Sequence, residues 1–181
     1  VNRLIRLTPQ EQTTTTTQNV EYLKTDEVGS TNLLQRIAKL TTSTYTLLYL
    51  SPKALILSYR CIDRLLQAEE ATKAAMVYAD RYDGTAAHTV LDYQAGSLRD
   101  DFDFGELLLI RTDLLQKFAK EEHNYKYAGL YALRLFLSRH GDLYHLREML
   151  YTSCETDTRK SGEKQFDYVA PHNRAVQLEC E

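Results

Sequence analysis

The chain has 181 residues and a formal net charge of −3, with acidic and basic residues in similar numbers. This length suits one domain with a sizeable core. The mixed charge argues against a disordered chain and against a strongly basic nucleic-acid binder. Three cysteines without metal-type spacing argue against a zinc site and against the disulfide framework of a secreted protein. No apolar stretch reaches the roughly 18 residues that a membrane span needs. With no visible signal peptide, we expect a cytoplasmic protein.

The first 40 residues are predicted to form two short strands and a helix. Residues 1–7 and 19–23 have strand-like patterns and are separated by a polar segment with five consecutive threonines. Apolar residues recur at helical spacing over residues 32–40, which predicts a helix capped by Ser30 or Thr31.

A strand and a long helix are predicted next. The nearly continuous apolar run of residues 45–50 is typical of a strand buried on both faces, so we expect it at the centre of a sheet. Residues 51–71 are predicted to be a helix, because Ser51 is a good cap and Pro52 suits the first helical position. The side of this helix that would face the sheet carries three apolar residues: Leu55, Ile62 and Leu66.

The second half of the chain continues the alternation of strands and helices. Strands are predicted at residues 74–79 and 107–110, and helices at residues 114–120 and 125–139. Residues 143–151 could form a strand or a helix, and the alternation of polar and apolar residues favours a strand. This order predicts an α/β sandwich of helices around a mainly parallel mixed sheet.

Two aspartates follow the strand predicted at residues 74–79. Asp80 and Asp83 are three residues apart, and a strand that brings carboxylates to its carboxyl edge can hold a divalent cation against a diphosphate. Their oxygen atoms suit Mg²⁺ or Mn²⁺. The alternative is a solvated turn that ends at Gly84.

A second acidic cluster provides candidates for a general base. Asp103 is the first candidate, because it precedes a Phe104-Gly105 turn where the backbone can approach an acceptor substrate closely. Asp101 is the alternate, since the residue between them would put both acids on one side of an extended segment. We expect the carboxylate of Asp103 to have no full salt bridge and a pKa raised by desolvation. The alternative is that these acids pair with Arg99.

Two arginines could bind the phosphate oxygens of such a diphosphate. Arg81 and Arg99 have the planar guanidinium that makes bidentate contacts with phosphate. Salt bridges to the neighbouring aspartates are the alternative for both.

The order of these segments resembles that of the inverting family 2 glycosyltransferases of the GT-A fold. The resemblance covers about residues 19–151. Four segments carry it: residues 30–50, the Val-Tyr-Ala-Asp run at 77–80, residues 104–111, and Tyr-Ala-Leu-Arg-Leu at 131–135 followed by Gly141.

The resemblance implies a GT-A-like nucleotide-diphospho-sugar transferase sandwich with a mainly parallel mixed sheet flanked by helices. It implies a single domain over residues 1–181 that lacks the family's first strand, as in a fragment of a longer chain. The implied activity is inverting transfer of a sugar from a nucleotide-diphosphate donor to the hydroxyl of a glycan acceptor. Such transfer would serve the synthesis of cell-surface polysaccharide or glycoconjugates, with Mg²⁺ or Mn²⁺ as cofactor.

The chain departs from this family at two motifs. An Asp-x-Asp motif is expected after residue 50, where residues 51–53 are Ser-Pro-Lys. The family's acidic pair, which holds the catalytic base, is replaced by Tyr-Ala at residues 127–128. A catalytically silent domain that binds a glycan or a protein partner is therefore the alternative function, and a structural module of a larger chain is a third.

Overall fold

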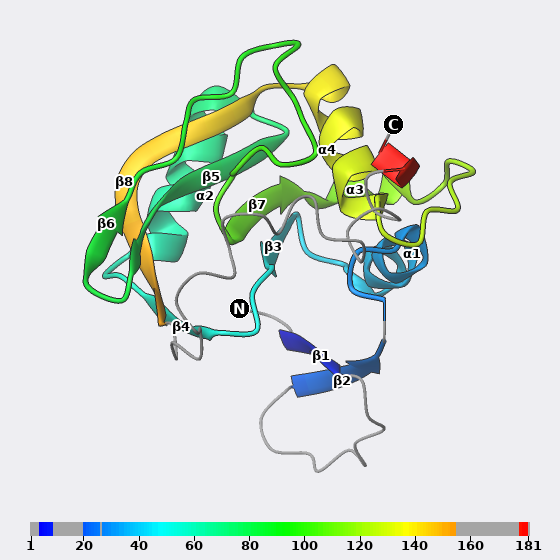
Figure 1. Ribbon diagram of the computed structural model, residues 1–181, viewed down its shortest axis with the longest axis horizontal. Coiled ribbons are helices and arrows are strands. Elements are labelled where there is room, and N and C mark those ends of the chain that lie inside the picture. Colours follow the sequence, from blue (N-terminus) through cyan, green and yellow to red (C-terminus); the bar gives the residue numbers. More distant parts are fainter. Residues whose placement is uncertain (1–3, 9–19, 26, 155–177, 181) are drawn as a thin grey trace.

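A curled mixed sheet flanked by helices forms the body of the protein (Figure 1). The structure is a computed structural model, and it describes residues 4–8, 20–25, 27–154 and 178–180. The threonine-rich segment lies outside these residues.

Six strands make up the main sheet. They are β3 (Tyr45–Tyr49), β4 (Ala54–Leu57), β5 (Met76–Asp83), β6 (Ala86–His88), β7 (Leu107–Arg111) and β8 (Leu143–Cys154). The strand order is β3-β7-β5-β8-β4, and β6 pairs with the outer part of β5. In the part of the chain described, only the β5–β8 pairing of this sheet is parallel.

The prediction of an α/β protein is confirmed, but the prediction of a mainly parallel sheet is wrong. A continuous apolar run indicates that both faces of a strand are buried, but it does not indicate the direction of the strand in the sheet. β3 and β5 nevertheless point the same way, because each is antiparallel to β7. The carboxyl ends of β3, β5 and β8 therefore lie at the same end of the sheet.

The central strand is β5, and β3 lies at an edge of the described sheet. Residues 76–79 are at most 1% exposed. The prediction that residues 45–50 are central is wrong, although their apolar pattern has a clear cause. Leu48 packs on the core of one face, while Leu47 and Tyr49 pack on the core of the other. An edge strand covered on both faces has the same pattern as a central one.

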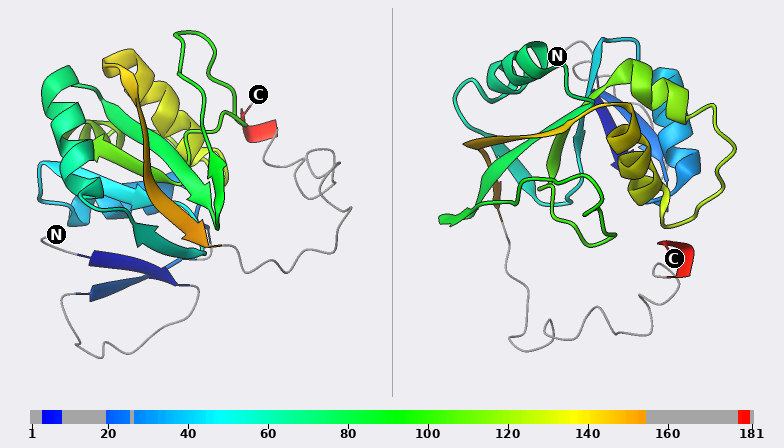
Figure 2. Two further views of the ribbon diagram at one scale, coloured as in Figure 1. Left: turned by 90° about the vertical axis from the view of Figure 1, so that its left-hand side faces the viewer. Right: turned by 90° about the horizontal axis from the view of Figure 1, so that it is seen from above.

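Helices cover both faces of the sheet (Figure 2). They are α1 (Thr31–Leu40), α2 (Cys61–Thr72), α3 (Thr112–Phe118) and α4 (Gly129–His140). Met76 and Tyr78 share a core with α1, α3 and α4, and the alternate residues Val77 and Ala79 share a core with α2. The helix predicted over residues 32–40 is confirmed with Ser30 as its cap, since the N–H of Leu33 donates to the Ser30 hydroxyl over 3.2 Å.

The long helix predicted over residues 51–71 is wrong in its first half. Residues 54–57 form β4, which pairs antiparallel with β8, and α2 begins only at Cys61. Arg60 interrupts any continuous helix, because its φ of 57° is left-handed. Strand pairing thus overrides the helix-start signal of the Ser-Pro dipeptide. The buried residues of α2 are Cys61, Leu65 and Glu69, whereas Ile62 and Leu66 are half-buried.

The remaining predicted strands are confirmed. β7 and β8 form as the patterns indicated, and β1 (Leu4–Thr8) pairs in parallel with β2 (Val20–Lys24) in a separate two-stranded sheet. Leu7 and Leu23 of this small sheet pack against the core beneath α1. None of the helices in the described residues combines the length and the hydrophobicity needed to cross a membrane.

Candidate functional site

Two polar clusters form where β5 ends at the carboxyl edge of the sheet. The first, which we call the buried cluster, consists of Asp80, Asp92, His145 and Arg147. His145 Nε2 lies 2.9 Å from Asp80 Oδ1, and His145 Nδ1 lies 2.7 Å from Asp92 Oδ1. Arg147 contacts both carboxylate oxygens of Asp92. The side chains of His145 and Asp80 are only 6% and 8% exposed.

The sheet register places His145 beside Tyr78. The two residues are partners in the parallel β5–β8 pairing, and their rings stack with centroids 5.0 Å apart. The Tyr78 hydroxyl donates to the Leu91 carbonyl and accepts from the Tyr93 N–H. The N–H of Val90 donates to Asp80 over 2.9 Å. The buried cluster therefore fastens residues 90–93 to the sheet.

Asp92 is the outer acid of the buried cluster. Hydrogen bonds from Arg147 and His145 lower the pKa of Asp92 from 3.8 to about 2. The carboxylate is therefore ionised at neutral pH, and it accepts hydrogen bonds from both Arg147 and His145.

The second cluster, which we call the open cluster, consists of Arg81, Asp83, His88 and Asp103. Arg81 Nε lies 3.2 Å from Asp83 Oδ1, and Arg81 Nη1 lies 3.4 Å from Asp103 Oδ2. His88 also contacts both acids, at 3.2 Å from Asp83 and 2.9 Å from Asp103. The Asp103 side chain is 47% exposed, so a substrate group could reach it.

A glycine turn fixes the position of Asp103. The N–H of Gly105 donates to Asp103 Oδ1 over 2.7 Å, and Gly105 has a φ of +74°. A Cβ atom at Gly105 would lie 2.6 Å from the Tyr151 hydroxyl, so a larger residue would clash as well as strain the backbone. The turn therefore needs a glycine at position 105. The group that lies close to this glycine is the Tyr151 hydroxyl, and not the acceptor substrate expected from the sequence.

The pKa of Asp103 is lowered, so the expectation of a raised pKa is wrong. Burial acts to raise this pKa, but hydrogen bonds from the Gly105 N–H and His88, together with the charge of Arg81, outweigh it. The carboxylate is ionised at neutral pH and can accept a proton. Its driving force for taking one is smaller than that of a desolvated, isolated acid.

The two aspartates predicted to bind metal lie in different clusters. Asp80 is engaged by His145 and Val90, while Asp83 is engaged by Arg81 and His88. Among the described residues, no group of three histidine, cysteine or acidic side chains is placed to hold a metal ion. The side chains of Asp80 and Asp83 therefore do not fit a shared Mg²⁺ or Mn²⁺ ion.

The other predicted residues lie on an exposed loop. Arg99 Nη2 pairs with Asp101 Oδ2 at 3.0 Å, with side chains 75% and 64% exposed. Of the six predicted site residues, the structure brings Arg81, Asp83 and Asp103 together. Asp80 is in the buried cluster, and the Arg99–Asp101 pair belongs to neither cluster.

Sequence reasoning missed His88, His145 and Arg134. The two histidines lie far from their aspartate partners in the sequence, without ligand spacing, and the fold brings each one between two aspartates. Arg134 lies on α4 with its guanidinium carbon 5.2 Å from the centroid of the Phe104 ring. Burial lowers the pKa of Arg134 to about 10, although the charge of Asp103 acts in the opposite direction.

Glu179 was also missed, and it lies at the start of α4. Its carboxylate accepts from the backbone N–H groups of Lys126, Tyr127 and Ala128 at 3.1, 2.6 and 2.9 Å. These three N–H groups precede the first turn of α4, so Glu179 holds the segment that leads into the helix at its N-cap residue Ala128. Burial acts to raise the pKa of Glu179, but the three N–H groups lower it. The helix predicted over residues 125–139 begins only at Gly129.

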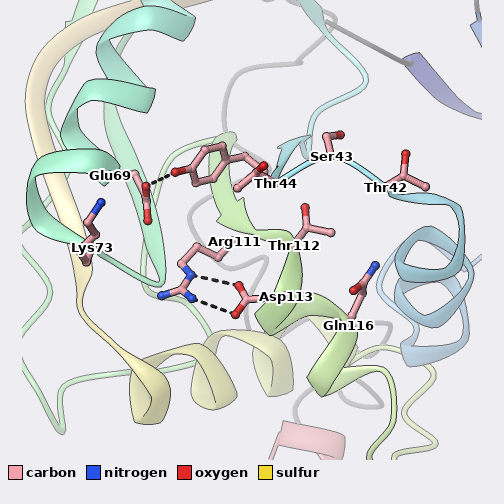
Figure 3. A pocket seen from close by; sticks show the side chains of 10 residues that line it. Thr42, Ser43, Thr44, Glu69, Lys73, Arg111, Thr112, Asp113 and Gln116 are labelled. Atoms are coloured by element: carbon pink, nitrogen blue, oxygen red, sulfur yellow. Dashed lines mark hydrogen bonds and ion pairs between the residues drawn. The ribbon is translucent and has the colours of Figure 1, made fainter.

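A hollow of about 480 Å³ opens at the opposite edge of the sheet, where β3 begins and β7 ends (Figure 3). Glu69 is buried there and accepts a hydrogen bond from the Tyr45 hydroxyl, which raises the pKa of Tyr45 to about 12. Arg111 donates twice to Asp113, at 3.1 and 2.9 Å. These groups satisfy one another, and they are remote from Asp103.

No protein-family model and no curated protein matches the chain. Among solved structures, the chain is similar to the bifunctional IspDF from Campylobacter jejuni, with 16% sequence identity and a TM-score of 0.39. The match covers 74% of this chain and 33% of that chain, so the protein spans about a third of the length of the structure it matches. A similarity this low supports no argument about activity.

These findings correct the resemblance to family 2 glycosyltransferases. No family model matches the chain, and the family's model is among those that do not. Membership of that family is therefore wrong as an interpretation of the four segments. Any activity has to be argued from the clusters themselves.

Proposed function

We propose that the protein is a transferase that moves a sugar from a nucleotide-diphosphate donor to an acceptor hydroxyl, with Asp103 as the general base. Transfer to a hydroxyl needs a group that takes the hydroxyl proton as the new bond forms. It also needs positive groups near the departing diphosphate. The open cluster, with Arg134 close by, has residues suited to both needs.

The observation that carries this proposal is the state of Asp103. It is an ionised carboxylate that is half-exposed, and its orientation is fixed by the Gly105 N–H and by His88. A base must be ionised, reachable and held in place before it can accept a proton efficiently. Asp80 is ionisable too, but its side chain is 8% exposed and is occupied by its partners.

Two arginines lie near Asp103. Arg81 Nη1 is 3.4 Å away, and the Arg134 guanidinium lies over the ring of the neighbouring Phe104. Guanidinium groups bind phosphate oxygens with bidentate geometry. They could therefore stabilise a leaving diphosphate without a metal ligand set.

The test is a transfer assay that follows release of nucleoside diphosphate. Uridine, guanosine and thymidine diphosphate sugars would be tried with simple glycosides as acceptors. We expect transfer by the wild-type chain and a loss of about 10²-fold or more in Asp103→Asn, with donor binding preserved, since only the proton acceptor is removed. Asp101→Asn is the matched control on the same loop.

The control separates a base from a nearby charge. Asp101 is exposed and pairs with Arg99, so its replacement should change the rate by no more than about twofold. A large loss in Asp101→Asn with normal turnover in Asp103→Asn would remove Asp103 from the reaction. Absence of transfer with every donor would overturn the enzyme proposal.

One observation favours a second candidate, a catalytically silent domain that binds a glycan or a protein partner. The lowered pKa of Asp103 and its contacts to Arg81 and His88 also suit a purely structural acid. In this case glycan binding without turnover is expected, and Asp103→Asn would leave that binding unchanged.

A further inference from the structure

Arg134 differs from the other arginines near the end of β5. Arg81, Arg99 and Arg147 each pair with a carboxylate. Arg134 makes no ion pair or hydrogen bond with any described residue, and its buried Nε has no partner. Its guanidinium carbon lies 5.2 Å from the centroid of the Phe104 ring.

A buried donor without an acceptor is unfavourable, so this arrangement calls for a compensating partner. Asp103 lies close enough to favour the charged form of Arg134, yet it is outside ion-pair distance and is already engaged by Arg81 and His88. The ring of Phe104 compensates in part through its electron-rich face. An acceptor for the N–H groups of the guanidinium is still missing.

We propose that Arg134 binds an oxyanion of the substrate, a phosphate or a carboxylate group, beside Asp103. This inference rests on the proposed function, in which that oxyanion belongs to the sugar nucleotide or to an acidic sugar. A guanidinium presents parallel N–H groups that match the two oxygens of such an anion. Partial burial strengthens the contact, because fewer water molecules compete for it.

The position of Arg134 would also orient the substrate. α4 carries Arg134 over Phe104, and Phe104 directly follows Asp103 in the chain. An anion held at the guanidinium would therefore stand next to the carboxylate that accepts the proton. Arg134 then acts as a binding residue, and Asp103 acts on the bound molecule.

Calorimetry on the full chain tests this inference with two probes, inorganic pyrophosphate and glucuronate. The two probes separate a phosphate ligand from a carboxylate ligand. We expect at least one to bind, and Arg134→Gln to weaken that binding by about 10-fold or more, as befits a hydrogen bond to a charged group. Arg139→Gln, an exposed arginine on the same helix, should bind within about twofold of wild type.

A conservative variant keeps the test decisive if Arg134→Gln does not fold. Arg134→Lys keeps the charge but loses the planar fork, so it should bind the same probe at least about threefold more weakly than wild type. Wild-type affinity in a folded Arg134 variant, or no binding of either probe to the wild-type chain, would overturn the inference.

The same measurement distinguishes this inference from the proposed function. Asp103→Asn should bind the probe at least as tightly as the wild-type chain does, because it removes a negative charge beside the anion and keeps Arg134. Binding that depends on Arg134, in a chain that transfers no sugar, would leave the anion site standing and remove the transferase proposal.

Discussion

The buried and open clusters have similar compositions and different surroundings. In each, one histidine ring lies between two aspartates, His145 in the buried cluster and His88 in the open one. His145 is 6% exposed and stacks on Tyr78, while His88 is 39% exposed. An arginine completes each set.

The two clusters make the same kinds of hydrogen bond. In each cluster the two ring nitrogens of the histidine lie within hydrogen-bond distance of one aspartate each. What differs is access. Asp80 bonds to the backbone N–H of Val90 and is 8% exposed, whereas both acids of the open cluster are 33% and 47% exposed; the outer acid of the buried cluster, Asp92, is 48% exposed. Burial of the histidine and of the inner acid Asp80, and not residue type, therefore distinguishes the buried cluster from the open one.

The largest expected difference is in stability, between Asp80→Ala and Asp83→Ala. Removing Asp80 leaves His145 and the Val90 N–H buried without their acceptor, and breaking a buried pair costs about 3–5 kcal/mol. Removing the more exposed Asp83 should cost about 0–1 kcal/mol. Chemical denaturation of both variants measures the free energies of unfolding. Equal losses would mean that burial does not separate the clusters.

The second difference concerns the fastening of residues 90–93. His145→Ala should weaken the local structure by about 1–3 kcal/mol, which speeds exchange of the Val90 and Tyr93 amides by roughly 5- to 150-fold. His88→Ala should leave these amides at the wild-type rate, since His88 contacts only the open cluster. Hydrogen exchange followed by NMR provides the measurement. Faster exchange in both variants would show that the clusters are coupled.

Much of the fold could be predicted from the sequence, because local signals and packing agree there. The Ser30 cap and the apolar spacing after it predict α1, and the apolar runs of β5 and β7 predict buried strands. The errors arise where a long-range pairing decides. β4 forms because β8 lies beside it, and the sequence of residues 54–57 has no signal for that partner. Strand direction in the sheet likewise depends on connections between distant segments.

The candidate site was predictable only in part, for a related reason. Asp83 and Asp103 are visible as acids that flank predicted strands, and the structure brings them together through Arg81 and His88. His88 has no partner residue at a recognisable spacing. Arg134 lies on the apolar-rich α4. The sequence pattern of this helix does not reveal that the guanidinium of Arg134 has no ion-pair partner among the described residues. Such information exists only once helix and sheet are packed.

The smallest expected effect is the acid dependence of stability. The pKa of Asp92 is lowered from 3.8 to about 2 by Arg147 and His145. A lowered pKa in the folded state adds stability that is fully present above pH 3.8 and is lost as the pH falls toward about 2. Asp92→Asn should therefore flatten the decline of the urea midpoint across this pH range. Asp103→Asn should flatten it in the same direction, because the pKa of Asp103 is also lowered. A wild-type decline in Asp92→Asn would mean that its contacts to Arg147 and His145 add no stability. The fastening of residues 90–93 would then depend on Asp80 and Tyr78 alone.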